Sequence, residues 1–452
     1  MKPNNVGIRP SQRKGFRAGK SMKWAIAAVT LVLLATTWAA GAEKILYTFQ
    51  GGSDGFFPVA GLIFDAKGDA YGTTLIGGGG PCEFGCGTIF KLTPSPSGEW
   101  TETIIHHFDP SAGDPGGVVA KLTFDQHGNL YGAGGSYLFK LAPGKGGQWT
   151  ETIIHEFNSC DTDGCDALGY LLFDRGNLYG TTAGGGGATG CGTVFKLAPQ
   201  TNGGWRETIL HVFHQGFSHC AGHSADGQHP DDGLIMDSSG NLYGTTVAGG
   251  PDDQGIVFKL APTKSGKWTE SILHAFVGLE HPTGGASPYG GLVMDNAGNL
   301  YGTTVGGGSA QLQAGVVFQL SPTQKGEWKE TVIHNFPTPR YHDGELPYAG
   351  LVIDTVGNLY GSTLDGGGQK ESQCNDNDGC GVVYKLSPTT NGKWKETILY
   401  AFQGGPDGAA PQDDRLAIDA AGNLYGTTVG GGANPCNDNM NAGCGVVFEI
   451  KP

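Results

Sequence analysis

Short apolar segments, separated by glycine, proline and asparagine, run through most of the chain. One stretch shows the pattern well, because residues 291–295, 299–304, 316–321 and 328–336 are each rich in β-branched and aromatic side chains. Segments of this length and composition, bounded by turn-forming residues, predict β-strands. Apolar residues do not recur at three- and four-residue spacing over a dozen positions, so this pattern does not predict helices.

The same layout recurs along the chain around one heptapeptide, Gly-Asn-Leu-Tyr-Gly-Thr-Thr. It is intact at residues 240–246, 298–304 and 422–428. With four near copies included, the central tyrosines are Tyr71, Tyr131, Tyr179, Tyr243, Tyr301, Tyr360 and Tyr425. Successive tyrosines are 48 to 65 residues apart, which is typical of stacked supersecondary units. Recurring turns therefore explain the 81 glycines of this 452-residue chain better than disorder does.

Seven units of four strands predict an all-β fold, a seven-bladed β-propeller of four-stranded antiparallel blades. An antiparallel meander places alternate connections on opposite faces. A short Asp-x-x-Gly turn, such as residues 295–298, follows the first strand of most units, and its aspartate can bond to the turn backbone. The short turns should share one face, and the long glycine-rich loops should share the other with the connections between blades. Binding is expected on the face with the long loops.

The two ends of the repeat region predict how the ring closes. The seventh unit ends after its third strand, at residues 446–451, and has no fourth strand of its own. Residues 43–49 match residues 396–402, the fourth strand of the sixth unit, position for position. The N-terminal strand is therefore expected to pair beside residues 446–450 and complete the last blade, which removes the open sheet edges.

The recurring Tyr-Gly-Thr-Thr, Gly-Gly-Gly, Val-Phe-Lys-Leu and Trp-x-Glu-Thr segments resemble the GloVer tandem-repeat family of bacterial exported proteins. The family is described as having a choice of anchor, because many members end in varied surface-anchoring tails. The resemblance covers residues 43–452, which are expected to form one propeller domain. It implies export but no particular catalytic residues. No anchoring tail follows the last strand, so a secreted or periplasmic location is expected.

The first 42 residues differ from the rest, with seven lysines and arginines and no acidic residue. A mostly apolar run at residues 24–40, followed by a small-x-small site, predicts a secretory signal peptide over residues 1–42. Met22 is the expected true start. The remaining chain carries 21 basic and 42 acidic residues, so it should repel nucleic acid. We expect no membrane span in the mature chain, and we expect a monomer.

Ten cysteines in an exported chain favour disulfide bonds over a zinc site. Four pairs are close in sequence, Cys82 with Cys86, Cys160 with Cys165, Cys374 with Cys380, and Cys436 with Cys444. The remaining Cys191 and Cys220 also fall in predicted loops of the same face. The expected role of these bonds is to restrain glycine-rich loops.

Two loops offer candidate metal ligands. The loop at residues 213–234 contains His219, His223 and His229, which could hold a transition metal, although their spacing matches no standard ligand template. Asp376 and Asp378 lie in an Asn-Asp-Asn-Asp-Gly run that could bind calcium, although the rest of the twelve-residue calcium loop is missing. The alternative in both cases is a solvated loop with no metal.

A histidine recurs in the fourth strand of five units, and tyrosine takes its place in the other two copies. These residues are His106, His155, His211, His274, His334, Tyr47 and Tyr400. A glutamate four residues earlier recurs in the same way. Catalysis requires one unique constellation, so a repeated group of this kind indicates a hydrogen-bonding packing element.

Several residues just before the first strands should line the axial mouth of the ring. They are Asp166, Asp231, Asp232, Tyr289, Tyr348, Asp413 and Asp414. Tyrosine and aspartate together suit a carbohydrate or a cationic group, so the first hypothesis is an exported module that binds a glycan or an extracellular protein. A second hypothesis is a polysaccharide hydrolase or lyase with converging carboxylates. A third is a structural envelope protein in which these residues only cap strands.

Overall fold

The computed structural model describes residues 42–114, 121–188, 190–214, 224–278, 284–308, 314–336, 343–367, 374, 379–411, 415–433, 436 and 443–452. Residues Ala40–Pro452 form one compact unit. The predicted signal peptide lies outside the described residues, apart from Ala42. Within the described ranges, no helix combines the length and the apolar character needed to cross a membrane.

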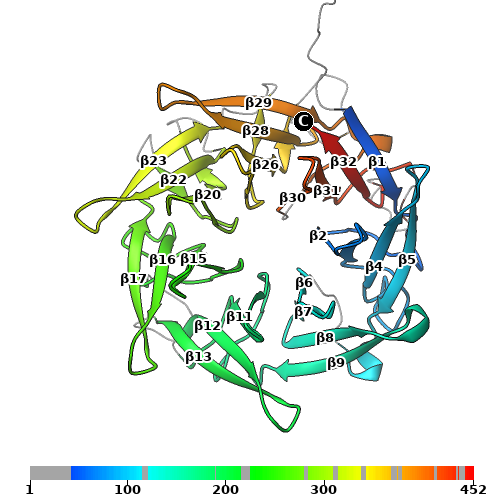
Figure 1. Ribbon diagram of the computed structural model, residues 1–452, viewed down its shortest axis with the longest axis horizontal. Helices are drawn as coiled ribbons and strands as arrows, with labels where there is room; N and C mark the ends of the chain where they lie inside the picture. The colour runs from blue at the N-terminus through cyan, green and yellow to red at the C-terminus, as the bar shows by residue number, and fades with distance from the viewer. Residues whose placement is uncertain are drawn as a thin grey trace, which may run out of the picture. The chain divides into compact units, whose positions relative to one another are not determined.

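The unit Ala40–Pro452 is a ring of seven four-stranded antiparallel sheets (Figure 1), which confirms the predicted all-β propeller. In each sheet the first strand lies nearest the centre and the last lies at the outside (Figure 1). Short two-stranded sheets are added in the connections by β18 (Gly285–Ala286) with β21 (Gly306–Gly307), and by β24 (Gly344–Glu345) with β27 (Asp365–Gly366).

The strands of the blades, from the centre outwards, have the following bounds. Blade 1 contains β2 (Ala60–Phe64), β3 (Ala70–Thr74), β4 (Thr88–Pro94) and β5 (Trp100–His107), and blade 2 contains β6 (Thr123–Phe124), β7 (Leu130–Gly134), β8 (Tyr137–Pro143) and β9 (Trp149–Glu156). Blade 3 contains β10 (Leu172–Asp174), β11 (Asn177–Thr182), β12 (Gly190–Pro199) and β13 (Trp205–His214), and blade 4 contains β14 (Ile235–Met236), β15 (Leu242–Thr246), β16 (Ile256–Pro262) and β17 (Trp268–Ala275). Blade 5 contains β19 (Val293–Met294), β20 (Leu300–Thr304), β22 (Val316–Pro322) and β23 (Trp328–Asn335), and blade 6 contains β25 (Val352–Ile353), β26 (Leu359–Thr363), β28 (Val382–Pro388) and β29 (Trp394–Ala401). Blade 7 contains β30 (Ala417–Ile418), β31 (Leu424–Thr428), β32 (Val446–Lys451) and β1 (Ala42–Thr48), and single 3-10 turns lie at Pro110–Ala112, Lys145–Gly147 and Gly405–Asp407.

Blade 7 is built from both ends of the repeat region, as predicted. β1 pairs antiparallel with β32, from Ala42 opposite Lys451 to Thr48 opposite Val446. The blue and red strands lie side by side in Figure 1. This pairing joins the two ends of the ring by hydrogen bonds and leaves neither β1 nor β32 to be completed by another chain.

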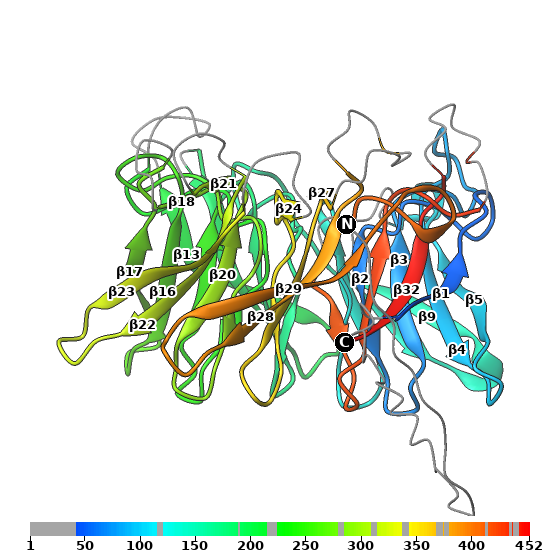
Figure 2. The ribbon, with the colours of Figure 1, turned by 90° about the horizontal axis from the view of Figure 1, so that it is seen from above.

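The two faces of the ring differ in the length of their connections, as the sequence predicts. Figure 2 shows tight hairpin turns along one edge of the strands and longer connections, with β18 and β24, along the other. We call these the short-turn face and the long-loop face. The first strand of each blade is entered from the long-loop face, so residues just before the first strands lie there, close to the axis.

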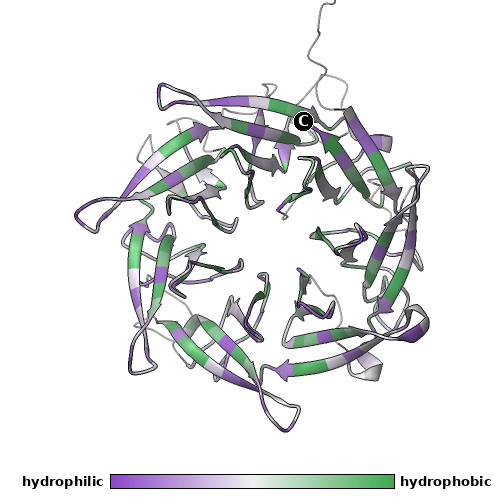
Figure 3. Cartoon of the chain, viewed as in Figure 1, coloured by the Kyte–Doolittle hydropathy of each residue, from purple (hydrophilic) through white to green (hydrophobic). Residues whose placement is uncertain are grey.

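Apolar side chains fill the space between neighbouring blades. Tyr243 and Phe276 of blade 4 pack with Leu300 and Phe318 of blade 5 in one buried cluster. The outermost strands alternate instead, with hydrophobic and hydrophilic bands along their length (Figure 3). The core is therefore divided into layers between blades, and the centre of the ring is left to a few residues near the first strands.

Candidate functional site

The residue just before the leucine at the first strand of each blade lies near the centre of the ring, where the first strands are innermost. It is glycine in four blades and a large residue in three, in the series Gly61, Lys121, Tyr170, Gly233, Gly291, Gly350 and Arg415. The Lys121 ammonium lies 5.0 Å from the centroid of the Tyr170 ring, and the Arg415 guanidinium lies 5.6 Å from it. Three blades thus supply large side chains that meet at the centre, and glycine in the others leaves room for them.

Asp232 of blade 4 is the charged counterpart of this group. Its Oδ1 lies 3.2 Å from Lys121 Nζ and accepts a 2.6 Å hydrogen bond from Gly233 N. A Cβ atom on Gly291 would lie 2.6 Å from Asp232 Oδ2 and 3.2 Å from Arg415 Nη2. Burial acts to raise the pKa of Asp232, but Lys121, Arg415 and the Gly233 N–H outweigh it and hold the pKa below its ordinary value. The carboxylate is therefore ionised and neutralised within the protein, between blades 2, 4 and 7.

Above this charged group, three consecutive blades present a side chain from one equivalent position. Asp231, Tyr289 and Tyr348 each follow a proline and lie two residues after a residue with left-handed backbone. Those preceding residues are His229 at φ 57°, Ser287 at φ 53° and Leu346 at φ 56°. We call Asp231, Tyr289 and Tyr348 the mouth arc.

The two tyrosines of the mouth arc contact each other. Their ring centroids are 5.2 Å apart and the ring planes are inclined by 59°. The side chain of Tyr289 is 38% exposed. Because blades 5 and 6 supply one ring each, the pair forms an aromatic surface across the blade boundary on the long-loop face.

The aspartate of the mouth arc has an unusual environment. Asp231 Oδ1 is buried and has no hydrogen-bond partner among the described residues. Burial is the main cause that raises the pKa of Asp231 to about 6, with the charges of Asp232 and Asp166 adding to the rise and those of His229 and Lys121 opposing it. Asp166 itself is exposed and takes left-handed backbone at φ 57°. The carboxyl group of Asp231 can thus exchange a proton near neutral pH.

Of the predicted metal ligands, only His229 lies within the described residues. Its Nδ1 is 3.0 Å from the carbonyl oxygen of Ala183, so Nδ1 donates to that oxygen and only Nε2 remains for a ligand. The other predicted ligands, and two of the predicted mouth residues, fall outside the described ranges. These are His219, His223, Asp376, Asp378, Asp413 and Asp414.

A second set of titratable groups lies at the outside of the ring, where one blade meets the next. Each group combines a histidine of an outermost strand, an aspartate of the following connection and a glutamate of the next blade's outermost strand. We call them the outer clusters, and they are His106/Asp114/Glu151, His155/Asp163/Glu207, His211/Asp226/Glu270 and His334/Asp343/Glu396. Within each cluster one ligand atom from each residue lies within 4.8 Å of the others, which is close enough to hold a metal ion.

Burial sets the protonation of the outer clusters. It lowers the pKa of His106, His155 and His211. It raises the pKa of Glu151 to about 8, with the neighbouring Asp114 adding to the rise. Burial thus favours the neutral imidazole in these three clusters, and the neutral form of the Glu151 carboxyl group in the absence of a cation.

The predicted disulfide bonds form where the cysteines are described. The bonded pairs are Cys82–Cys86, Cys160–Cys165, Cys374–Cys380 and Cys436–Cys444. Cys191 is disulfide-bonded too, and its predicted partner Cys220 lies outside the described residues. All four described bonds restrain connections on the long-loop face, and disulfides of this number are typical of an extracellular or periplasmic protein.

The short-turn face carries grooves between blades. One, of about 620 Å³, lies between blades 1 and 2 and is lined by Tyr71, Phe124 and Trp149 with the adjacent turns. Another, of about 410 Å³, lies between blades 3 and 4. These grooves follow the repeat, because the same strands and turns border them, so they define no unique site.

Lys121, Tyr170 and Arg415 are absent from the residues predicted from the sequence. The signal for them was present, since they replace a glycine that precedes the first-strand leucine in the other four repeats. The aspartates of the outer clusters were missed as well. Three of the four precede glycine, at Asp163-Gly164, Asp226-Gly227 and Asp343-Gly344, a pattern that aligned repeats would have shown.

The ring of seven four-stranded sheets, closed by its N-terminal strand, defines a seven-bladed β-propeller. Residues 133–375 match the Gloeobacter/Verrucomicrobia repeat. This match spans more than half of the chain, and the protein belongs to that repeat family. No curated protein matches the sequence.

Solved structures with very different sequences superpose on this chain to different degrees. A fungal alcohol oxidase of the AA5 family, described in complex with copper, superposes with a TM-score of 0.53 at 14% identity, covering 91% of this chain and 77% of its own. Virginiamycin B lyase from Staphylococcus aureus gives a TM-score of 0.47 at 13% identity, covering 91% of this chain and 99% of its own. At such identities the likeness concerns the fold, and function has to be argued from the residues of this chain.

Proposed function

We propose that the protein is an exported binding module that takes a glycan at the mouth arc. The observation that carries the proposal is the placement of Asp231, Tyr289 and Tyr348 at one equivalent position on three consecutive blades. Blades 1 and 3, where the position is also described, carry Val59 and Leu168 there instead. Among the described positions the arc thus differs from its equivalents, as a specific site requires.

The chemistry of the arc suits a sugar. The faces of aromatic rings carry partial negative charge and pack well against the C–H groups of a pyranose. A carboxylate accepts hydrogen bonds from vicinal hydroxyl groups, and Asp231 has a buried oxygen without a partner among the described residues. A few polar groups beside an apolar platform are the usual composition of a small-molecule site.

Export is part of this proposal. The predicted leader and the disulfide bonds both suit an oxidising compartment. The acidic mature chain makes a neutral or cationic glycan a better ligand than an anionic one.

One observation favours a second candidate, a polysaccharide hydrolase or lyase. The raised pKa of Asp231, about 6, would let its carboxyl group act as a general acid, with Asp166 as the second carboxylate. The binding module is the better supported function, because Asp232 is neutralised by Lys121 and the outer clusters recur around the ring.

The test is a glycan array on the mature protein, followed by calorimetry with the best ligand. Tyr289→Ala and Tyr348→Ala should each weaken binding at least tenfold, which corresponds to about 1.4 kcal/mol. Asp231→Asn should weaken binding as well, since the amide keeps only one acceptor oxygen. The matched control is Val356→Ala, because Val356 is 75% exposed in a turn of the opposite face.

Three outcomes are distinct. Binding that the arc variants abolish and Val356→Ala retains supports the proposal. Release of reducing or unsaturated sugar that Asp231→Asn abolishes identifies the enzyme instead. No binding to any glycan, or equal binding by all variants, contradicts the mouth arc as a site and leaves a structural role.

A further inference from the structure

The outer clusters raise a question that packing alone does not answer. In His106, His155, His211 and His334 the buried Nε2 atom has no hydrogen-bond partner among the described residues. Unpaired buried polar atoms are rare in folded proteins, because each costs free energy. Here the same unpaired atom recurs at four blade boundaries, each time facing two carboxyl groups.

Most distances from the histidine Nε2 atoms to the carboxylate oxygens are longer than those of good hydrogen bonds. His106 Nε2 lies 3.3 Å from Asp114 Oδ2 and 3.7 Å from Glu151 Oε1. In blade 5, His334 Nε2 lies 3.6 Å from Asp343 Oδ2 and 3.3 Å from Glu396 Oε1. His211 Nε2 lies 3.7 Å from Asp226 Oδ2 and 3.8 Å from Glu270 Oε1. Hydrogen bonds between such atoms are about 2.7–3.2 Å long.

These distances, 3.3 Å to 3.8 Å, are close to those between ligands that share an ion. Zinc lies about 2.0–2.2 Å from histidine nitrogen and carboxylate oxygen, so ligand atoms at tetrahedral angles are about 3.3–3.6 Å apart. The clusters therefore have the dimensions of a coordination site, with three protein ligands and a position for water.

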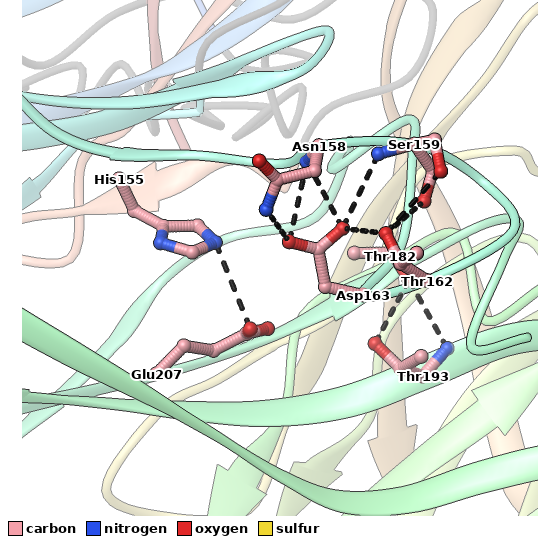
Figure 4. A network of polar contacts seen from close by, with 8 residues as sticks. All are labelled: His155, Asn158, Ser159, Thr162, Asp163, Thr182, Thr193 and Glu207. Carbon is pink, nitrogen blue, oxygen red and sulfur yellow. Dashed lines mark hydrogen bonds and ion pairs between the residues drawn. The ribbon is translucent and has the colours of Figure 1, made fainter.

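The ligands are held in place before any ion arrives. Figure 4 shows His155 and Glu207 facing each other, with Asp163 beside them. Asp163 accepts hydrogen bonds from the Asn158 backbone at 2.9 Å, from the Asn158 side chain at 2.7 Å and from Thr162 Oγ1 at 2.9 Å. Supporting bonds of this kind orient the ligands of metal sites.

Two blade boundaries show how the cluster closes without an ion. At these boundaries tyrosine replaces histidine, and its hydroxyl donates directly to the aspartate. Tyr47 reaches Asp54 Oδ2 at 3.0 Å, and Tyr400 reaches Asp407 Oδ2 at 2.9 Å. The tyrosine side chain is longer, so its hydroxyl enters the space between the carboxyl groups. In the outer clusters the shorter histidine leaves that space to another group.

The seventh boundary provides a natural comparison. His274 Nε2 lies 3.5 Å from Glu330, but Gly284 stands where the other boundaries have aspartate. Gly284 is equivalent to those aspartates because of the glycine that follows each of them. Gly227, Gly285 and Gly344 each pack against the equivalent threonine of their own blade. Among the described residues this boundary therefore has two ligands, His274 and Glu330, and no aspartate.

We infer that the four outer clusters are sites for a divalent transition-metal ion, each bound by one imidazole and two carboxylates that bridge neighbouring blades. One nitrogen and two oxygens suit borderline ions such as zinc. Calcium prefers oxygen ligands only and a higher coordination number. The two carboxylates balance the charge of the ion. Each ion links the outermost strands of two blades, so binding stabilises the ring.

The test uses mature protein treated with EDTA, then titrated with zinc and measured by calorimetry, elemental analysis and melting temperature. Replacing His106, His155, His211 and His334 together by tyrosine should remove four zinc ions per chain and abolish the rise in melting temperature. His155→Tyr alone should remove one ion while keeping the metal-free melting temperature, since tyrosine closes this cluster as Tyr47 and Tyr400 do.

Two controls separate coordination from packing. His274→Tyr should leave the zinc stoichiometry unchanged, because its boundary lacks the aspartate. Gly284→Asp should add one ion, because it completes that cluster. Calcium should not replace zinc at equal concentration. Equal zinc binding by the fourfold variant and the unmodified protein would overturn the inference. An equal loss of bound zinc in His155→Tyr and His274→Tyr would overturn it as well.

Discussion

Tyr384 shows how a single side chain departs from the repeat. In the other six blades the equivalent residue is phenylalanine, as at Phe318, and it packs over a strand glycine. The aromatic ring leaves no room for a side chain in place of that glycine, since a Cβ on Gly302 would lie 2.6 Å from Phe318 Cζ. Tyr384 places a hydroxyl group in this space, and the hydroxyl is buried without a hydrogen-bond partner among the described residues.

Tyr384→Phe should therefore stabilise the protein. Burial raises the pKa of Tyr384 far above its ordinary value, helped by the charges of Glu396 and Asp343, so the hydroxyl is neutral and simply desolvated. Removing an unsatisfied hydroxyl should increase the free energy of unfolding by about 1 kcal/mol. Urea denaturation measures the change, and Tyr360→Phe is the control because Tyr360 donates a 3.0 Å hydrogen bond to Asp354. A loss of stability in Tyr384→Phe would show that the hydroxyl has a partner.

In six of the seven blades one aspartate stabilises the hairpin between the first two strands, the exception being the shorter turn of blade 3. Asp295 Oδ1 accepts hydrogen bonds from the backbone of Ala297 and Asn299, both at 2.9 Å. Its Oδ2 accepts from the Asn299 side chain at 2.7 Å and from the Tyr301 hydroxyl at 3.0 Å. The Asp, Asn and Tyr of the repeated motif thus form one network that joins the turn to the second strand. The motif is explained by structure and needs no ligand.

This network predicts how stability depends on pH. Partial burial acts to raise the pKa of Asp295, but the hydrogen bonds from Asn299, Tyr301 and Ala297 outweigh it and lower the pKa below 3.8. The same holds for Asp125, Asp237, Asp354 and Asp419. A group whose folded pKa is depressed stabilises the fold above its unfolded pKa of about 3.9, and this stabilisation is lost as the pH falls through the folded value.

The melting temperature should therefore fall as the pH is lowered from about 5 to below 3. Asp295→Asn should melt lower than the parent at pH 6, and the difference should shrink as the pH falls through the lowered pKa of Asp295, where the carboxylate of the parent becomes protonated. Thermal unfolding followed by circular dichroism at several pH values measures this. A difference that stays constant with pH would show that charge on Asp295 contributes nothing.

The whole ring is held together at its centre as well as at its seam. Lys121, Asp232 and Arg415 come from blades 2, 4 and 7, and Lys121 and Asp232 are almost fully buried. Breaking a buried ion pair leaves a desolvated charge behind, whereas breaking an exposed one costs little. Losing one of the charges at the centre should therefore lower the stability of the whole ring.

Lys121→Met should destabilise the protein by about 3 kcal/mol, because it leaves Asp232 with Arg415 as its only cation. The control is Arg175→Met. Arg175 Nε lies 3.8 Å from Asp174 Oδ1, and their side chains are 86% and 34% exposed, so this variant should lose less than about 1 kcal/mol. Chemical denaturation of both variants gives the comparison. Equal losses of the free energy of unfolding would mean that Asp232 is better solvated than its burial indicates.

Local pattern predicted the repeat, the strand order, the two faces and the closing strand, because each depends on residues near one another in the sequence or on a match between copies. The charges at the centre could not be predicted in this way. Lys121 and Asp232 are 111 residues apart, and which blades face each other across the ring depends on its curvature. The histidines and glutamates of the outer clusters were recognised as repeated, but their aspartates lie in connections of unequal length, which hid the third member.

The pairing of β1 with β32 has a consequence for the order in which the chain folds. One strand of blade 7 is made first during synthesis, and its partner, some 400 residues later, is made last. The blades between can form from local contacts as they emerge, but the final sheet has to wait for the last residues. A nascent chain is thus an incomplete arc whose first strand is unpaired, and the slowest folding step should be the joining of the two ends.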